Sequence, residues 1–132
     1  ILDRIDICVE AAPVTIKDLD APASGYDTKT LRVMVEEARE MQKKRYRETA
    51  YDFNGEVSGN DVKKFCRLGE KEQRFLEQAY EAGQMSVRSY HKIIKLARTI
   101  ADLEHADEIS VAHLSEAICY HNGKRLFERR NE

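Results

Sequence analysis

The chain has 132 residues, of which 42% are hydrophobic and 35% are charged. This length suits one domain, and the composition is typical of a folded, well-solvated chain rather than a disordered one. The net charge of −2 exerts no overall attraction on nucleic acid or on an anionic membrane, so such binding would need a local patch. No apolar run approaches the roughly 20 residues that a membrane-spanning helix needs, so we expect no membrane partner.

The first 25 residues are predicted to form a short strand followed by a linker. Ile5, Ile7 and Val9 fall on one face of residues 1–10, which is typical of a strand. A single strand cannot form a sheet, so it would pair with a segment outside this chain or lie loose. The linker after it is rich in proline and small residues, which places a domain boundary near residue 25.

Residues 26–132 are predicted to form an all-α bundle of four or five helices. Apolar residues recur at steps of three and four, and capping residues precede most of the runs. The expected ranges are 28–50, 58–66, 70–82, 86–104 and 110–121, and the charged tail beyond them is expected to fray. The first helix is expected to bury a stripe made of Leu31, Met34, Val35, Ala38 and Met41.

The helix 86–104 is expected to be central, because its apolar stripe is the widest in the chain. Ser86 is a good N-cap residue, and Arg88 lies in the first turn after it. A cation is mildly unfavourable there because the N-terminal end of a helix is already positive, and a bound anion would compensate. The alternative for Arg88 is an ordinary solvated side chain.

The motifs of a complete enzyme are missing from this sequence. It contains no G-x-x-x-x-G-K-[ST] phosphate loop, and no apolar strand that ends in paired acids. The four histidines lack the spacing of metal ligands, so we expect no metal site. Cys8, Cys66 and Cys119 are far apart and odd in number, which favours reduced thiols in a cytoplasmic protein. We therefore expect this chain alone to be catalytically inactive.

A helix-turn-helix module that binds DNA is one interpretation of residues 70–104. They are predicted to run helix, glycine-containing turn, helix, and the start of the second helix would read the bases. The candidate readers are Ser86, Arg88, Ser89, His91 and Lys92. The same outline occurs in any helical hairpin. This interpretation predicts duplex binding that weakens steeply as salt rises.

A more specific pattern is SVRSYHKIIKLARTIADLE at residues 86–104, followed by a helix with matching residues up to Tyr120. This pattern resembles the C-terminal domain of the magnesium-chelatase-like AAA+ ATPases, in the bacterial branch related to the competence-associated ATPase and the magnesium chelatase ATPase subunit. The opening ILDRIDICVE is similar to the end of that family's ATPase core, usually written LLDRIDI. The string ARTIADLE is the most specific part. The resemblance covers nearly the whole chain in order.

The resemblance implies that residues 26–132 are the lid domain of a ring-forming ATPase, and that residues 1–25 are the end of its core. The core would precede this chain in the same protein, which would bind ATP and Mg²⁺, while this part alone would hold neither. Arg88 matches the family's sensor-2 arginine and, with Ser86, would contact the nucleotide. Arg4 matches the arginine finger, which acts on the ATP of a neighbouring subunit in a homo-oligomeric ring.

Several points stay open at the level of the sequence. Without its core, Arg4 is expected to have no fixed place, and its alternative role is that of a surface arginine paired with Asp3 and Asp6. The family's arginine after Tyr120 is replaced here, since the sequence runs Tyr-His-Asn-Gly to Gly123. This departure puts in doubt the role of the end of the last helix. DNA as a partner of the parent ring is left open, as are the ring's substrate and size.

Overall fold

The structure, a computed structural model, describes residues 4–83 and 85–130, with side chains described up to Gly123. The described residues form helices and no strand. The elements are α1 (Ile16–Leu19), α2 (Thr28–Arg45), the 3₁₀ turn η2 (Asn54–Glu56), α3 (Val62–Phe65), α4 (Glu70–Glu81), α5 (Val87–Leu103) and α6 (Val111–Arg130). The prediction of an all-α bundle is therefore confirmed.

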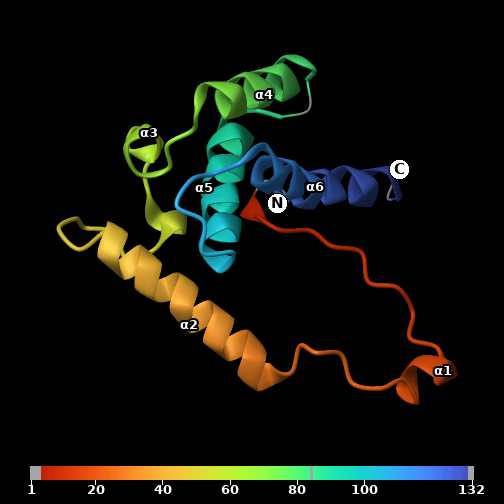
Figure 1. Ribbon diagram of the computed structural model, residues 1–132. Helices are drawn as coiled ribbons and strands as arrows, with labels where there is room; N and C mark the ends of the chain where they lie inside the picture. The colour runs from red at the N-terminus through yellow and green to blue at the C-terminus, as the bar shows by residue number, and fades with distance from the viewer. Residues whose placement is uncertain (1–3, 84, 131–132) are drawn as a thin grey trace.

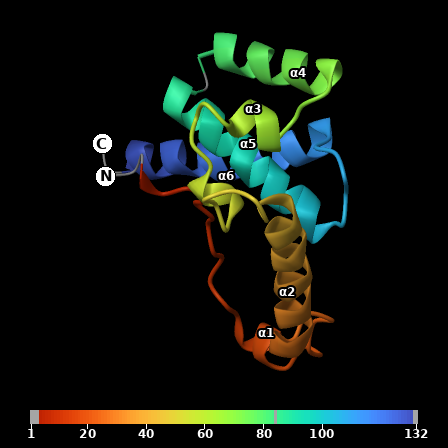
Figure 2. The same cartoon turned by 90° about the vertical axis from the view of Figure 1, so that its left-hand side faces the viewer.

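Helix α5 lies at the centre of the bundle, as its wide apolar stripe predicts. It packs against α6, α2, η2 and α3, while α4 rests on α6 (Figures 1 and 2). The residues of α5 that are buried in the core are Ile93, Ile94, Ala97, Ile100 and Ala101. Those of α6 are Leu114, Ala117 and Ile118. These residues recur at steps of three and four, which is the spacing expected for the inward face of a helix.

The buried stripe predicted for α2 is wrong over the N-terminal half of the helix. Only Ala38 and Gln42 are buried in α2, while Leu31 and Val35 are 47% and 50% exposed. Figure 1 shows the reason, because this half of the helix extends away from the bundle and no described element covers it. The helix also ends at Arg45 instead of residue 50. The spacing of apolar residues identifies the apolar face of a helix, but it does not show whether another element packs against that face.

Two further expectations at the chain ends are corrected. Residues 5–14 form no strand, because no strand in the described part of the chain lies beside them. This segment instead touches α6, where the backbone N–H of Cys8 donates to the carbonyl of Tyr120 at 3.2 Å. At the other end, the backbone stays helical to Arg130, although the charged tail was expected to fray.

A buried carboxylate joins three elements of the bundle. Asp102 of α5 has no exposed surface and accepts two hydrogen bonds from Arg45 of α2, at 2.6 and 2.9 Å. It accepts a third from the side-chain amide of Asn54 in η2 at 2.9 Å. Arg98 donates to the same carboxylate from one turn earlier, at 3.2 Å. Both carboxylate oxygens are therefore satisfied by groups that come from separate parts of the chain.

The remaining donors and acceptors of this network are also paired. Arg98 donates to the backbone carbonyls of Ala106 and Asp107, at 2.5 and 2.8 Å. Asn54 accepts from the Tyr46 hydroxyl at 2.7 Å, and its backbone N–H donates to Gln42 at 2.8 Å. Burial is the largest single influence on Arg45 and lowers its pKa, but the hydrogen bonds and the charge attraction of Asp102, together with the contribution of Tyr46, outweigh it, so that the pKa of Arg45 is raised.

The ends of the central helices are capped as the sequence predicts. The Ser86 hydroxyl accepts from the backbone N–H of Ser89 at 3.2 Å and so begins α5. Gly83, just after α4, has a φ of +70°, which suits a glycine at a helix C-terminus. The end of α5 at Leu103 agrees with the predicted range 86–104, but the sequence analysis did not identify His105 as the left-handed residue after it, with a φ of 56°.

We predict that Asp102→Asn lowers the free energy of unfolding by about 3 kcal/mol, because the buried guanidinium of Arg98 and the partly buried guanidinium of Arg45 lose their counter-charge. Urea unfolding of the chain, followed by circular dichroism, measures this loss. Glu48→Gln, at an exposed position, is the matched control and should change the free energy by less than about 0.5 kcal/mol. Equal stabilities of the two variants would show that the network does not hold the bundle together.

We also predict that Ser86→Ala lowers the free energy of unfolding by about 1 kcal/mol, since the first turn of α5 loses its cap. Ser86→Asp should keep most of the stability, because a carboxylate also accepts from the N–H of Ser89 and favours the helix dipole. The same urea titration compares the two variants. An equal loss in both would contradict a capping role for Ser86.

Candidate functional site

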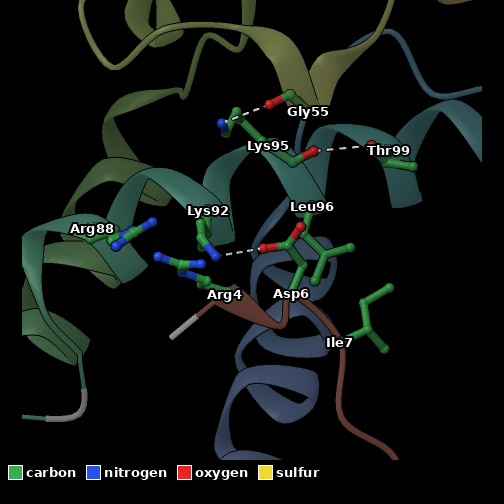
Figure 3. Close-up of a pocket in the computed structure, with 9 residues that line it drawn as sticks. All are labelled: Arg4, Asp6, Ile7, Gly55, Arg88, Lys92, Lys95, Leu96 and Thr99. Atoms are coloured by element: carbon green, nitrogen blue, oxygen red, sulfur yellow. Dashed lines mark hydrogen bonds and ion pairs between the residues drawn. The ribbon is translucent and has the colours of Figure 1, made fainter. Parts of the chain in front are cut away.

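Arg4 and Arg88, the two arginines predicted to act on phosphate, line the same pocket. The pocket has a volume of about 460 Å³ and lies between the N-terminal segment, η2 and a partly exposed face of α5. Its lining residues are Arg4, Asp6, Ile7, Gly55, Arg88, Lys92, Lys95, Leu96 and Thr99. Figure 3 shows the two guanidinium groups turned towards a common space. Arg4 and Arg88 are far apart in the sequence, and the fold brings them to one pocket.

Helix α5 supplies one wall of the pocket at regular spacing. Arg88, Lys92, Lys95 and Thr99 follow one another at steps of four, three and four residues, so they share one face of the helix. Sequence analysis named Lys92 only as a candidate reader of DNA, and it named Thr99 only within the family pattern. The helical spacing from Arg88 was the signal that could have placed both of them at this site.

Ser86 is not part of the pocket wall. Its hydroxyl is engaged at the cap of α5, where it accepts from the N–H of Ser89 and donates to the Ser89 hydroxyl at 3.1 Å. The described geometry therefore gives Ser86 the task of starting the helix on which Arg88 stands. A direct contact between Ser86 and a ligand stays a prediction.

Arg4 lies beside α5 in the structure. The segment that carries it is joined to α5 by an ion pair, in which Asp6 Oδ1 lies 2.8 Å from Lys92 Nζ. Asp6 was expected as a salt partner of Arg4 itself, but it pairs with Lys92 instead. Asp3, the other expected partner, lies outside the described residues.

The charge of the pocket favours an anion. Four of its side chains are basic and one is acidic, and the acid is already paired with Lys92. Lys95 donates to the carbonyls of Gly55 and Val57, at 3.0 and 3.2 Å, so its ammonium group holds η2 against α5. Within the described part of the chain, Arg4 and Arg88 have no hydrogen-bond or ion-pair partner. Two unpaired guanidinium groups beside one space fit a phosphate or carboxylate group.

The chemistry of the pocket does not fit a metal cation. Its nearest ligand candidate is the Asp6 carboxylate, and the surrounding charges would repel a cation. Elsewhere in the described residues, no three His, Cys, Asp or Glu side chains gather as metal ligands. The three cysteines are free, and burial raises the pKa of the Cys66 thiol. Along the described chain, no helix combines the length and apolarity needed to cross a bilayer.

Comparison with known proteins places the chain in a family. Residues 25–121 match the family described as magnesium chelatase, subunit ChlI C-terminal. The chain is 33% identical over 129 residues to the competence protein ComM of Haemophilus influenzae. It is 35% identical over 126 residues to the uncharacterised protein YifB of Salmonella typhimurium. These alignments cover 97% and 95% of this chain, and 25% and 24% of the relatives.

The chain thus spans about a quarter of the length of the curated relatives it matches. The family match includes all of α2 to α5, and it ends within α6. The alignments to relatives extend over nearly the whole chain. From the match and the fold together, the chain belongs to the family of magnesium chelatase subunit ChlI C-terminal domains.

Proposed function

We propose that this chain is the lid domain of a ring-forming AAA+ ATPase, and that Arg4 and Arg88 bind the phosphates of one ATP molecule. The observation that carries the proposal is the pocket that both arginines line, in which neither has a partner among the described residues. The family assignment supports it, since the matching family takes its name from a magnesium chelatase subunit. The nucleotide-binding core, with its phosphate loop and its Mg²⁺ ligands, would lie elsewhere in the same protein.

The chemistry of ATP hydrolysis suits two guanidinium groups. Negative charge on the γ-phosphoryl oxygens must be stabilised in the transition state, and a planar guanidinium offers several donors in fixed directions. Arg88 stands in the first turn of a capped helix, where the local backbone dipoles also favour an anion. The pocket therefore combines two side-chain charges with the positive end of α5.

The shared pocket has a consequence for the geometry of the ring. The family resemblance implies that Arg4 is an arginine finger, which reaches the ATP held by a neighbouring subunit. Because Arg4 and Arg88 line one pocket, both arginines would face the same nucleotide. We therefore propose that Arg88 acts as a sensor arginine on that neighbouring ATP as well.

The helix-turn-helix interpretation gains no support from the described residues. Ser89, one of the expected base readers, is buried, with 8% of its surface exposed. Lys92, another of them, is ion-paired with Asp6. One relative is named a competence protein, and this name states no contact with DNA. We assign any such contact in this protein to a surface other than the pocket.

We predict that Arg88→Ala and Arg4→Ala each lower the kcat of ATP hydrolysis in the full-length protein, while the fold stays intact. An arginine finger contributes about 10³- to 10⁵-fold in rate, so the loss at Arg4 should fall in that range, and the loss at Arg88 should exceed about tenfold. The control is Arg74→Ala, which removes an exposed arginine of α4. Phosphate release assays measure turnover, and unchanged turnover in both pocket variants would rule out the proposed roles.

Action between subunits makes a separate prediction. Subunits with Arg4→Ala keep a working core, whereas subunits that lack the phosphate-loop lysine keep a working Arg4. When the two inactive proteins are mixed, some interfaces should pair a working core with a working arginine, and ATPase activity should return. Mixtures made with Arg88→Ala should recover in the same way. Recovery with Arg4→Ala alone would show that the two arginines face different nucleotides.

A further inference from the structure

We propose that Asp6, Lys92 and Gly123 form a positioning clamp, which holds residues 4–8 against α5 and α6 and sets Arg4 opposite Arg88. The inference rests on the proposed function, because it explains how Arg4 reaches the phosphate-binding pocket. The sequence analysis considered Lys92 only as a possible reader of DNA bases, and Gly123 lies beyond the family match, which ends at residue 121. The clamp is built from two contacts on different helices.

The first contact joins the Arg4 segment to the helix that carries Arg88. Asp6 lies two residues after Arg4, and its carboxylate is 2.8 Å from the ammonium group of Lys92. Lys92 follows Arg88 by four residues, so the two share a face of α5. The ion pair therefore anchors the segment one helical turn away from Arg88, within the pocket that both arginines line (Figure 3).

The second contact joins the same segment to α6. The backbone N–H of Cys8 donates to the carbonyl of Tyr120, one turn before Gly123. A Cβ atom at Gly123 would lie 2.5 Å from the carbonyl oxygen of Cys8 and 3.1 Å from its carbonyl carbon. These are backbone atoms that cannot rotate away, so the segment fits here only because residue 123 has no side chain.

Gly123 is otherwise an unfavourable choice. It lies in the interior of α6, where glycine stabilises a helix less than alanine does. Close approach of another backbone is one of the few reasons for a glycine at such a position. This contact also gives a role to the end of the last helix, where the sequence departs from the family's usual arginine after Tyr120.

The two anchors make Arg4 part of the lid. Arg4 is two residues from the first anchor and four from the second, which leaves little chain to absorb movement. Since the anchors lie on α5 and α6, a rotation of the bundle would carry Arg4 and Arg88 together. Displacing a catalytic group by about 1 Å can cost about 10²-fold in rate, so loss of the clamp should lower turnover even when Arg4 and Arg88 are both present.

The alternative role for Lys92 is a direct contact with the phosphate. The effect of a substitution at Asp6 distinguishes the two roles. If Lys92 acts through the clamp, Asp6→Asn and Lys92→Met break the same ion pair and should lower kcat equally, by about 10- to 10²-fold. If Lys92 binds phosphate itself, Asp6→Asn removes a carboxylate that competes with phosphate for the ammonium group, and activity should stay the same or rise. The second result would overturn the clamp.

A double-mutant cycle in the full-length protein tests whether Lys92 acts through Arg4. A positioning residue has nothing left to position in Arg4→Ala, so adding Lys92→Met to that variant should cause no further loss. The reversed pair, Asp6→Lys with Lys92→Asp, should recover part of the activity lost in either single variant. A full further loss in the Arg4→Ala background would overturn the clamp. Unchanged turnover in Arg4→Ala alone would instead count against the proposed function.

The Gly123 contact is tested by a readout that does not need activity. Gly123→Ala should displace the segment and raise the rate at which maleimide modifies Cys8, measured by peptide mass spectrometry. Alanine favours a helix more than glycine does, so α6 should remain folded. Gly25→Ala is the matched control, since an added Cβ there meets nothing within 4 Å. Unchanged labelling of Cys8 in Gly123→Ala would show that the contact does not hold the segment.

Discussion

The buried carboxylate of Asp102 is the constraint on which the rest of this domain depends. Taking a charge out of water is expensive, and it is tolerated only when partners satisfy nearly every lone pair. Here the partners come from α2, η2 and α5 itself, through Arg45, Asn54 and Arg98. A partly satisfied network would cost more than an apolar core, so these three elements are bound to one mutual arrangement.

The candidate site rests directly on this arrangement. Thr99 accepts a hydrogen bond from the Asn54 side chain at 3.0 Å, and it also lines the pocket. Gly55 follows Asn54 in η2, and Lys95 holds the Gly55 carbonyl against α5. Thr99 and Gly55 therefore connect the pocket to the buried network, whereas Arg88 lies about three turns before Thr99, in the first turn of the same helix. Helix α5 is thus held rigidly near its C-terminal end by the buried network, and at its N-terminal end it presents the free donors of Arg88. This arrangement suits a side chain that must hold a ligand in a fixed position.

Local signals made most of the helices predictable, and missing partners explain most of the errors. The cap at Ser86 and the apolar spacing of α5 depend on neighbours in sequence, so both were foreseen. The strand predicted for residues 1–10 and the N-terminal half of the buried stripe predicted for α2 both depend on a partner surface that a local pattern does not specify. Neither is found in the described residues. For the site, the family resemblance singled out Arg4 and Arg88. Their meeting in one pocket depends on contacts between distant parts of the chain, such as Cys8 with Tyr120, which no local pattern reports.

Two arginines on α5 show how the same side chain takes opposite roles. Arg98 is buried, and its donors are directed to Asp102 and to the carbonyls of Ala106 and Asp107. The guanidinium of Arg98 therefore stabilises the fold and has no role in binding a ligand. Arg88 is exposed at the helix N-terminus, and none of its donors has a partner among the described residues. A guanidinium that keeps its donors free beside a second one is electrostatically unfavourable until an anion lies between them. The unused donors of Arg88, rather than its place in a motif, are the structural reason to look for a phosphate there.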